Sequence, residues 1–151
     1  MMNMRANCVI EALNQANLNW KGRFDTILSV GAHDYKVSII ENDTSVEIQA
    51  WLPVVVDDFR LSRARTGIEV ANDKLTCGEF HLNEKEGRIS FKLYDLDAGT
   101  TFTTERMKGL LDYCRKTLET RAEPLCEELN KTVVGRFLSV LGIESKECRE
   151  A

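Results

Sequence analysis

The side chains best suited to bind a metal are two histidines and one cysteine. His33 falls in a predicted turn, where a solvated polar residue is expected, and His81 falls on the outer side of a predicted strand, four residues after Cys77. Cys77 and His81 could share one face of a regular strand. A closed zinc site needs four ligands, however, and this pair supplies only two. We therefore predict no metal site.

The acidic pairs offer little sign of acid–base catalysis. Asp57-Asp58 and Asp95-x-Asp97 lie where helix starts and turns commonly use aspartate. General acid–base catalysis needs two carboxylates that converge on one cleft in different environments, and nothing in the sequence indicates such convergence. Cys114 lies on the apolar stripe of a predicted helix, which favours a core position over a nucleophile. GxSxG, GxxxxGK[ST] and GxGxxG motifs are absent. We expect no enzymatic activity and no cofactor.

Three arginines, Arg60, Arg63 and Arg65, form a small basic cluster on a predicted helix. The cluster could contact an anion or an acidic peptide. The favoured interpretation is a solvated helix face whose charge is balanced by Asp57 and Asp58.

Large aromatic side chains are the better candidates for a binding function. Trp51 and Tyr94 fall on the polar side of their predicted strands, so they either contact a partner protein or lie beneath a helix that covers the sheet. Phe137 belongs to a C-terminal apolar stripe that must pack on the protein's own sheet or on a second subunit. Trp51, Tyr94 and Phe137 are therefore the predicted partner-contact residues.

The elements that carry these residues begin with strands of period two. Residues 44–52 are the clearest strand, with Trp51 on the side opposite the apolar set, and Pro53 is expected to close it. Residues 24–31 and 34–41 precede it, joined by expected turns at Ala32-His33 and Asn42-Asp43. Residues 75–96 form a hairpin around a polar turn at residues 83–87. The pattern predicts about five antiparallel strands.

Helical spacing of apolar residues predicts the remaining elements: residues 5–17, residues 59–72, and a long segment that starts at the N-cap Thr103. Pro124 must kink or end that segment, and the sequence leaves open whether it separates two helices. A further helix is expected over residues 131–141. Strands and helices in separate runs indicate an α+β fold in one domain, residues 1–151.

Composition limits the environment and the partners. A net charge of −4 and a pI near 5.3 argue against nucleic acid and against an anionic membrane surface. No apolar run approaches the ~20 residues of a membrane span, and the first residues lack a signal-peptide pattern. Five widely spaced cysteines are typical of reduced thiols rather than of disulfides. These features predict a cytoplasmic protein.

Several weak motifs follow one another in a recognisable order. Asn72 ends an apolar helix and is followed by LTCGEFHL and EGRISFKLYDLD, by a threonine-led helix start at residues 102–105, and by a helix that carries Pro124. The run WLP at residues 51–53, followed by valines, fits the same series. In this order the chain resembles the YbjN family of bacterial sensory transduction regulators.

The resemblance implies the fold of the type III secretion chaperones, a twisted antiparallel sheet flanked by helices and commonly dimeric. It brings no catalytic residues with it. The chain departs from the pattern in its added C-terminal segment, residues 132–151, so the family's mode of dimerisation is not carried over.

From the residues and the resemblance together, we expect a chaperone-like or regulatory protein-binding module that forms a homodimer. The alternative is a small-ligand-binding sensory domain, in which Gly67 and Gly78 would mark close approach of the backbone to a ligand.

Overall fold

The computed structural model describes residues 4–42, 45–96 and 101–130, except for the side chains of residues 4 and 96. The elements follow in the order α1 (Met4–Gln15), β1 (Asp25–Val30), β2 (His33–Glu41), β3 (Ser45–Val55), η1 (Asp58–Arg60), α2 (Leu61–Asn72), β4 (Glu79–Asn83), β5 (Arg88–Leu96), α3 (Thr104–Thr117), η2 (Leu118–Ala122) and α4 (Glu123–Leu129). The predicted C-terminal helix at residues 131–141, and Phe137 within it, lie outside the described residues.

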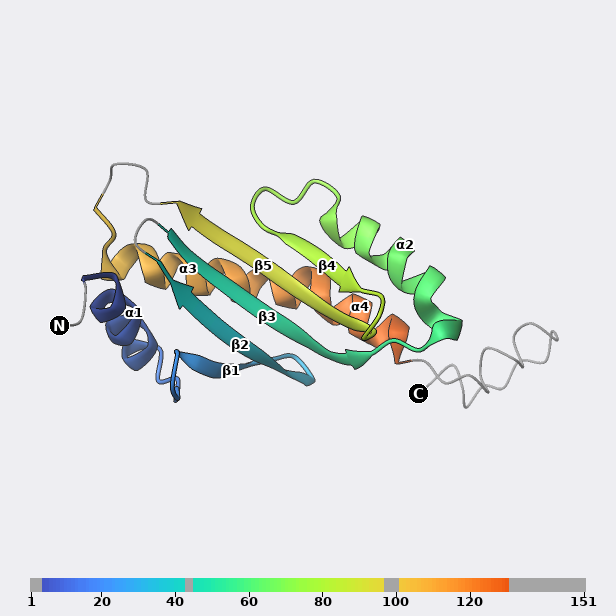
Figure 1. Cartoon of the computed structure of the whole chain (residues 1–151), viewed down its shortest axis with the longest axis horizontal. Helices are drawn as coiled ribbons and strands as arrows, with labels where there is room; N and C mark the ends of the chain where they lie inside the picture. The colour runs from blue at the N-terminus through green and yellow to red at the C-terminus, as the bar shows by residue number, and fades with distance from the viewer. Residues whose placement is uncertain (1–3, 43–44, 97–100, 131–151) are drawn as a thin grey trace.

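The strands form one antiparallel sheet in the order β1-β2-β3-β5-β4. A long helical run, from α3 through η2 to α4, crosses behind the sheet, α1 packs on α3, and α2 lies beside β4 and α4 (Figure 1). The α+β class and the five antiparallel strands predicted from the sequence are confirmed.

The period-two pattern divides the sheet into a buried and an outer face. Along β3, Val46, Ile48, Ala50, Leu52 and Val54 are buried and the residues between them are half-buried or exposed. Side chains on the buried face are closely packed by the helices, and the largest ones are almost fully excluded from solvent. We call the opposite side of the sheet, which carries the alternate side chains of all five strands, the outer face.

Two strand limits differ from the sequence prediction. The first turn is Gly31-Ala32, one residue earlier than expected, because Val30 pairs with His33 and Gly31 takes the positive φ that this tight turn requires. Pro53 does not close β3, which continues to Val55 through a register irregularity between Trp51 and Val55. Such an irregularity tolerates a residue that has no amide proton to donate.

Pro124 follows a local change in the helical run rather than a break in it. It lies in the first turn of α4, where a missing amide proton costs little, and the five-residue π-helical turn η2 joins α3 to α4 directly. The predicted N-cap is confirmed, since the Thr103 hydroxyl accepts a hydrogen bond from the amide of Arg106 at 3.1 Å. Phe102 and Met107, the predicted hydrophobic staple across this cap, are both buried.

Candidate functional site

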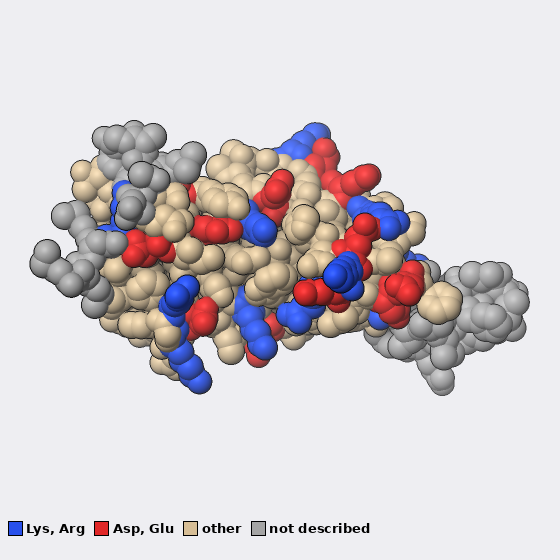
Figure 2. All heavy atoms as spheres, in the orientation of Figure 1, with Lys and Arg blue, Asp and Glu red and all other residues tan. Residues whose placement is uncertain are grey.

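The outer face of the sheet carries the two predicted contact residues that the structure describes. No helix within residues 4–42, 45–96 and 101–130 covers this face, and Tyr94 is 55% exposed on it (Figure 1). The charges on this side are scattered and of both signs, with uncharged surface between them (Figure 2). Within the described residues, Trp51 and Tyr94 thus lie on a sheet face without a helical cover.

Trp51 packs among side chains of the two neighbouring strands. The register places it between Lys36 of β2 and Ser90 of β5, and the small Ser90 leaves room for the indole ring. The guanidinium carbon of Arg88 lies over the ring, 5.5 Å from a ring centroid, as in a cation–π contact. Trp51 is half-buried, and Arg88 packs over its ring.

A shallow hollow of about 180 Å³ lies beside this ring. Its walls come from three strands: Asp34 and Lys36, the stretch from Trp51 to Val55, and Arg88. Val55 is 60% exposed at its edge. The Nε atom of Arg88 is buried and has no hydrogen-bond partner among the described residues. The hollow thus combines apolar walls with one unused donor.

Tyr94 is a separate feature of the same face. It lies opposite Glu47 in the register, and the negative charge of Glu47 raises the pKa of the Tyr94 hydroxyl. Ser90 is the residue of β5 that lies opposite Trp51, and Tyr94 follows Ser90 by four residues on the same strand. At the usual rise per residue, four residues span about 13 Å. The structure therefore places the two aromatic residues on one face without bringing them into contact.

Each arginine of the predicted cluster forms an ion pair with a carboxylate. Arg60 bonds the N-cap Asp57, as proposed from the sequence, but Arg63 pairs with Glu128 and Arg65 pairs with Glu84. Arg60 also donates to the backbone carbonyl of the last residue of α4. The arginines therefore tie α2 to α4 and to the hairpin loop, and the cluster is a balanced helix surface.

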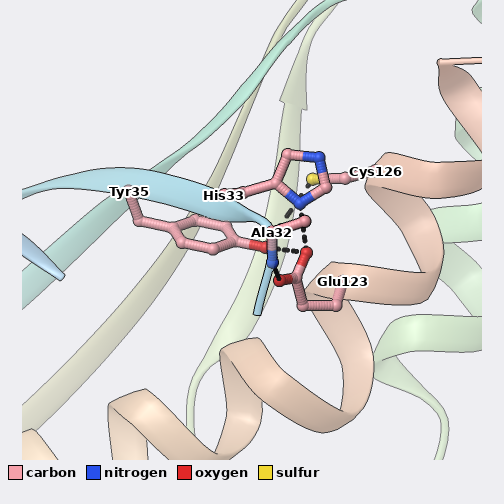
Figure 3. A network of polar contacts seen from close by, with 5 residues as sticks. All are labelled: Ala32, His33, Tyr35, Glu123 and Cys126. Carbon is pink, nitrogen blue, oxygen red and sulfur yellow. Dashed lines mark hydrogen bonds and ion pairs between the residues drawn. The ribbon is translucent and has the colours of Figure 1, made fainter. Parts of the chain in front are cut away.

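A polar network that the sequence did not reveal centres on Glu123, at the start of α4 (Figure 3). Its carboxylate accepts a hydrogen bond from the amide of Ala32 at 2.9 Å and from the hydroxyl of Tyr35 at 3.3 Å, and it is bonded to Nδ1 of His33. The Glu123 side chain is largely buried, with 12% of its surface exposed. A Cβ atom on Gly31 would overlap it, so the turn can come this close only with a glycine there.

The surroundings of this carboxylate indicate a structural role. Burial raises the pKa of Tyr35 and raises the pKa of the neighbouring Cys126 thiol to about 11, so both groups stay neutral at ordinary pH. Neither the hollow beside Trp51 nor a second hollow between α2 and α4 is lined by His33 or Glu123. The network fastens the β1–β2 turn to α4.

His33 was therefore interpreted wrongly from the sequence as a solvated turn residue. The only sequence signal for its partner was an acidic residue, Glu123, between the apolar Ala122 and Leu125 on a predicted helix. The π-helical turn η2 changes the helical phase just before Glu123 and directs it towards the sheet. An ideal helix drawn from the sequence would not have placed it there.

The candidate metal ligands and the candidate ligand-site glycines are the remaining residues singled out from the sequence. Cys77 and His81 are exposed, and no group of three potential ligands occurs among the described residues. Gly67 packs against the side chain of Leu125 rather than against another backbone, and a Cβ on Gly78 would meet the Phe91 ring at 2.7 Å. Both glycines are thus explained by contacts within the chain.

Comparison with known proteins supports the fold. No family model matches the sequence, and no curated protein matches it. The structure belongs to the α+β class that pairs one five-stranded antiparallel sheet with helices packed on a single face. Within that class it matches the crystal structure of YbjN from E. coli, described as a candidate transcription regulator. The TM-score is 0.58 over 83% of this chain and 90% of that one, at 11% sequence identity.

The fold of the chain is therefore YbjN-like, as the sequence motifs predicted, and identity this low shows the fold alone. None of the helices within the described residues is long and apolar enough to cross a membrane.

Proposed function

We propose that this protein is a non-enzymatic protein-binding module, a chaperone-like or regulatory adaptor, which holds a segment of a partner protein on the outer face around Trp51. The observation that supports this proposal best is the unit formed by Trp51 and Arg88. It stands beside a hollow on a sheet face that no described helix covers.

The chemistry of the hollow suggests how such a segment is held. An apolar side chain of the partner would fill the space between Trp51, Pro53 and Val55 and remove their surface from water. A carbonyl or carboxylate oxygen of the partner would accept the hydrogen bond that Nε of Arg88 does not make in the chain alone. Tryptophan and arginine are the residue types most often found at the energetic centre of protein interfaces.

The polarity of the rest of the face fits a reversible contact. Asp34, Lys36 and Arg88 line the hollow, and charges of both signs are scattered over this face in Figure 2. Interfaces that form and dissociate have such polar rims. A second copy of the chain would meet the same face, so the homodimer implied by the resemblance is tested by the same variants. We place this binding in the cytoplasm, in line with the unpaired cysteines.

The alternative of a small-ligand sensory domain has less support. It depended on Gly67 and Gly78 approaching a ligand, whereas in the structure these residues approach Leu125 and Phe91. The buried face of the sheet is filled by side chains of the described helices. The outer face remains the better candidate.

The test compares binding by three forms of the full chain: wild type, Trp51→Ala and Trp20→Ala. Trp20 is a matched control because it is the other tryptophan of the chain, is half-buried like Trp51, and lines neither of the two hollows described in this article. Proteins captured by the wild type are identified, and their affinities for the three forms are measured, together with the molar mass of each form by light scattering.

We expect Trp51→Ala to weaken partner binding, or self-association, by at least about 30-fold, which is about 2 kcal/mol and typical of a residue at the centre of an interface. Trp20→Ala should bind like the wild type. The proposal is wrong if Trp51→Ala keeps every affinity within about threefold of the wild type and keeps the same molar mass.

A further inference from the structure

A second hollow lies on the helical side of the molecule, between α2 and α4. Its volume is about 410 Å³, and it is lined by Phe59, Ser62, Arg63, Thr66, Gly67 and Glu128. Phe59 is 88% exposed, which is unusual for a phenylalanine. We call this hollow the α2–α4 groove.

The shape of the groove allows a helix to pack into it. Ser62 and Thr66 are one turn apart on α2, and with Gly67 they make a low ridge that lets another backbone come close. Val70, one further turn along, is 69% exposed and extends the same stripe of α2. From Phe59 to Gly67 the groove spans eight residue steps, or about 12 Å of helix.

The direction of α4 brings the chain to one end of this groove. Gly67 packs on Leu125, whereas Arg63 is paired with Glu128 farther along α4, so α2 and α4 run antiparallel. Arg60 then donates to the backbone carbonyl of Leu129, the last residue of α4. The chain therefore leaves α4 beside the Phe59 end of the groove.

The residues that follow carry the apolar stripe noted in the sequence. Val133 is three residue steps from Asn130, so it can lie at most about 11 Å from the end of the described chain. The buried face of the sheet is already filled by other helices, and the outer face lies on the opposite side of the sheet from α4 (Figure 1). Within that reach, the α2–α4 groove is the unfilled surface.

We propose that residues 133–141 of the same chain form a helix that docks in the α2–α4 groove, parallel to α2 and antiparallel to α4. Its stripe spans eight residue steps, the same ~12 Å as the groove. The connection from Asn130 to Thr132 has the length of a tight helix–helix turn. The stripe of the docked helix would cover Phe59; its members are Val133, Val134, Phe137, Leu138 and Leu141.

Disulfide trapping in the full chain tests this arrangement. The starting variant carries Cys77→Ser, the described exposed cysteine, and Cys148→Ser. Thr66→Cys, in the groove, is then combined with Leu138→Cys. The matched control combines Leu138→Cys with Val55→Cys, which places the second thiol on the exposed edge of the outer face.

We expect the groove pair to form an intramolecular disulfide at least about tenfold faster than the control pair, because docking raises the effective concentration of the two thiols. Phe59→Ser in the groove-pair variant should reduce that difference. Equal rates, faster trapping by the control pair, or a disulfide between two chains would each overturn the proposal. This site is separate from the hollow beside Trp51, so its failure would leave the proposed function untouched.

Discussion

Replacement of Glu123 by alanine is the sharpest test of how the β1–β2 turn is held. The substitution removes the acceptor for the amide of Ala32, which lies in an exposed turn, and for the buried hydroxyl of Tyr35, which keeps only its contact with the Cys126 sulfur. A buried group that loses its partner costs about 1–3 kcal/mol. The Tyr35 hydroxyl therefore accounts for most of a predicted loss of about 2 kcal/mol in the free energy of unfolding, a sizeable share of the stability of a domain of this size.

Urea unfolding of the full chain measures this loss. With a slope of about 2 kcal/mol per molar urea, a loss of about 2 kcal/mol lowers the midpoint by about 1 M. Glu123→Gln should cost only about 1 kcal/mol. Its side-chain oxygen still accepts from Ala32, and its NH₂ group can donate to His33 or Tyr35.

Glu127→Ala is the matched control, because Glu127 is an exposed acidic residue one helical turn farther along α4. It should change stability by no more than about 0.5 kcal/mol. If Glu123→Ala cost as little as Glu127→Ala, the carboxylate would not be fastening the turn, and the structural role argued for the network would fall.

Two further predictions concern helix glycines and pH. Gly109→Ala, on an open face of α3, should raise the free energy of unfolding by up to about 1 kcal/mol. Gly67→Ala should gain less or lose stability, since its Cβ would overlap a leucine of α4. Equal gains for the two variants in urea unfolding would contradict that contact. Burial raises the pKa of Cys126 to about 11, above its unfolded value of about 8.5. The neutral thiol therefore stabilises the native state fully below about pH 8.5, and this contribution is lost as the pH rises towards 11. Between pH 8 and pH 10 Cys126→Ala should lose about 1–2 kcal/mol less than the wild type; an identical loss would show that this thiol ionises equally well in both states.

The parts of the fold that could be predicted are those with a local signature. The outer position of Trp51 followed from the alternation along β3, because a sheet with one buried face must alternate. The start of α3 followed from Thr103, since the capping hydroxyl acts on an amide three residues away. Each of these signals is complete within a few residues of sequence.

The parts that could not be predicted depend on contacts between distant segments. Glu123 and His33 are 90 residues apart, and their contact requires the change of helical phase in η2 that no local pattern announces. The stacking of Arg88 on Trp51 likewise depends on the register between β3 and β5. The candidate site was therefore predicted as an exposed tryptophan, without the arginine and the hollow that make it a binding feature.

The two edges of the sheet determine whether a partner protein can bind by adding a strand to it. At the β4 edge, the side chain of Asn72 donates to the carbonyl of Phe80 and accepts from its amide, as an added strand would. At the β1 edge, both backbone groups of Asp25 are bonded to Lys21, and Arg115 donates to a carbonyl near the other end of the strand. A partner strand would have to displace these bonds before it could pair with either edge. Strand addition is therefore disfavoured at both edges. Recognition by side chains on the outer face needs no such displacement, and this favours the hollow beside the tryptophan of β3 as the place where a partner is held.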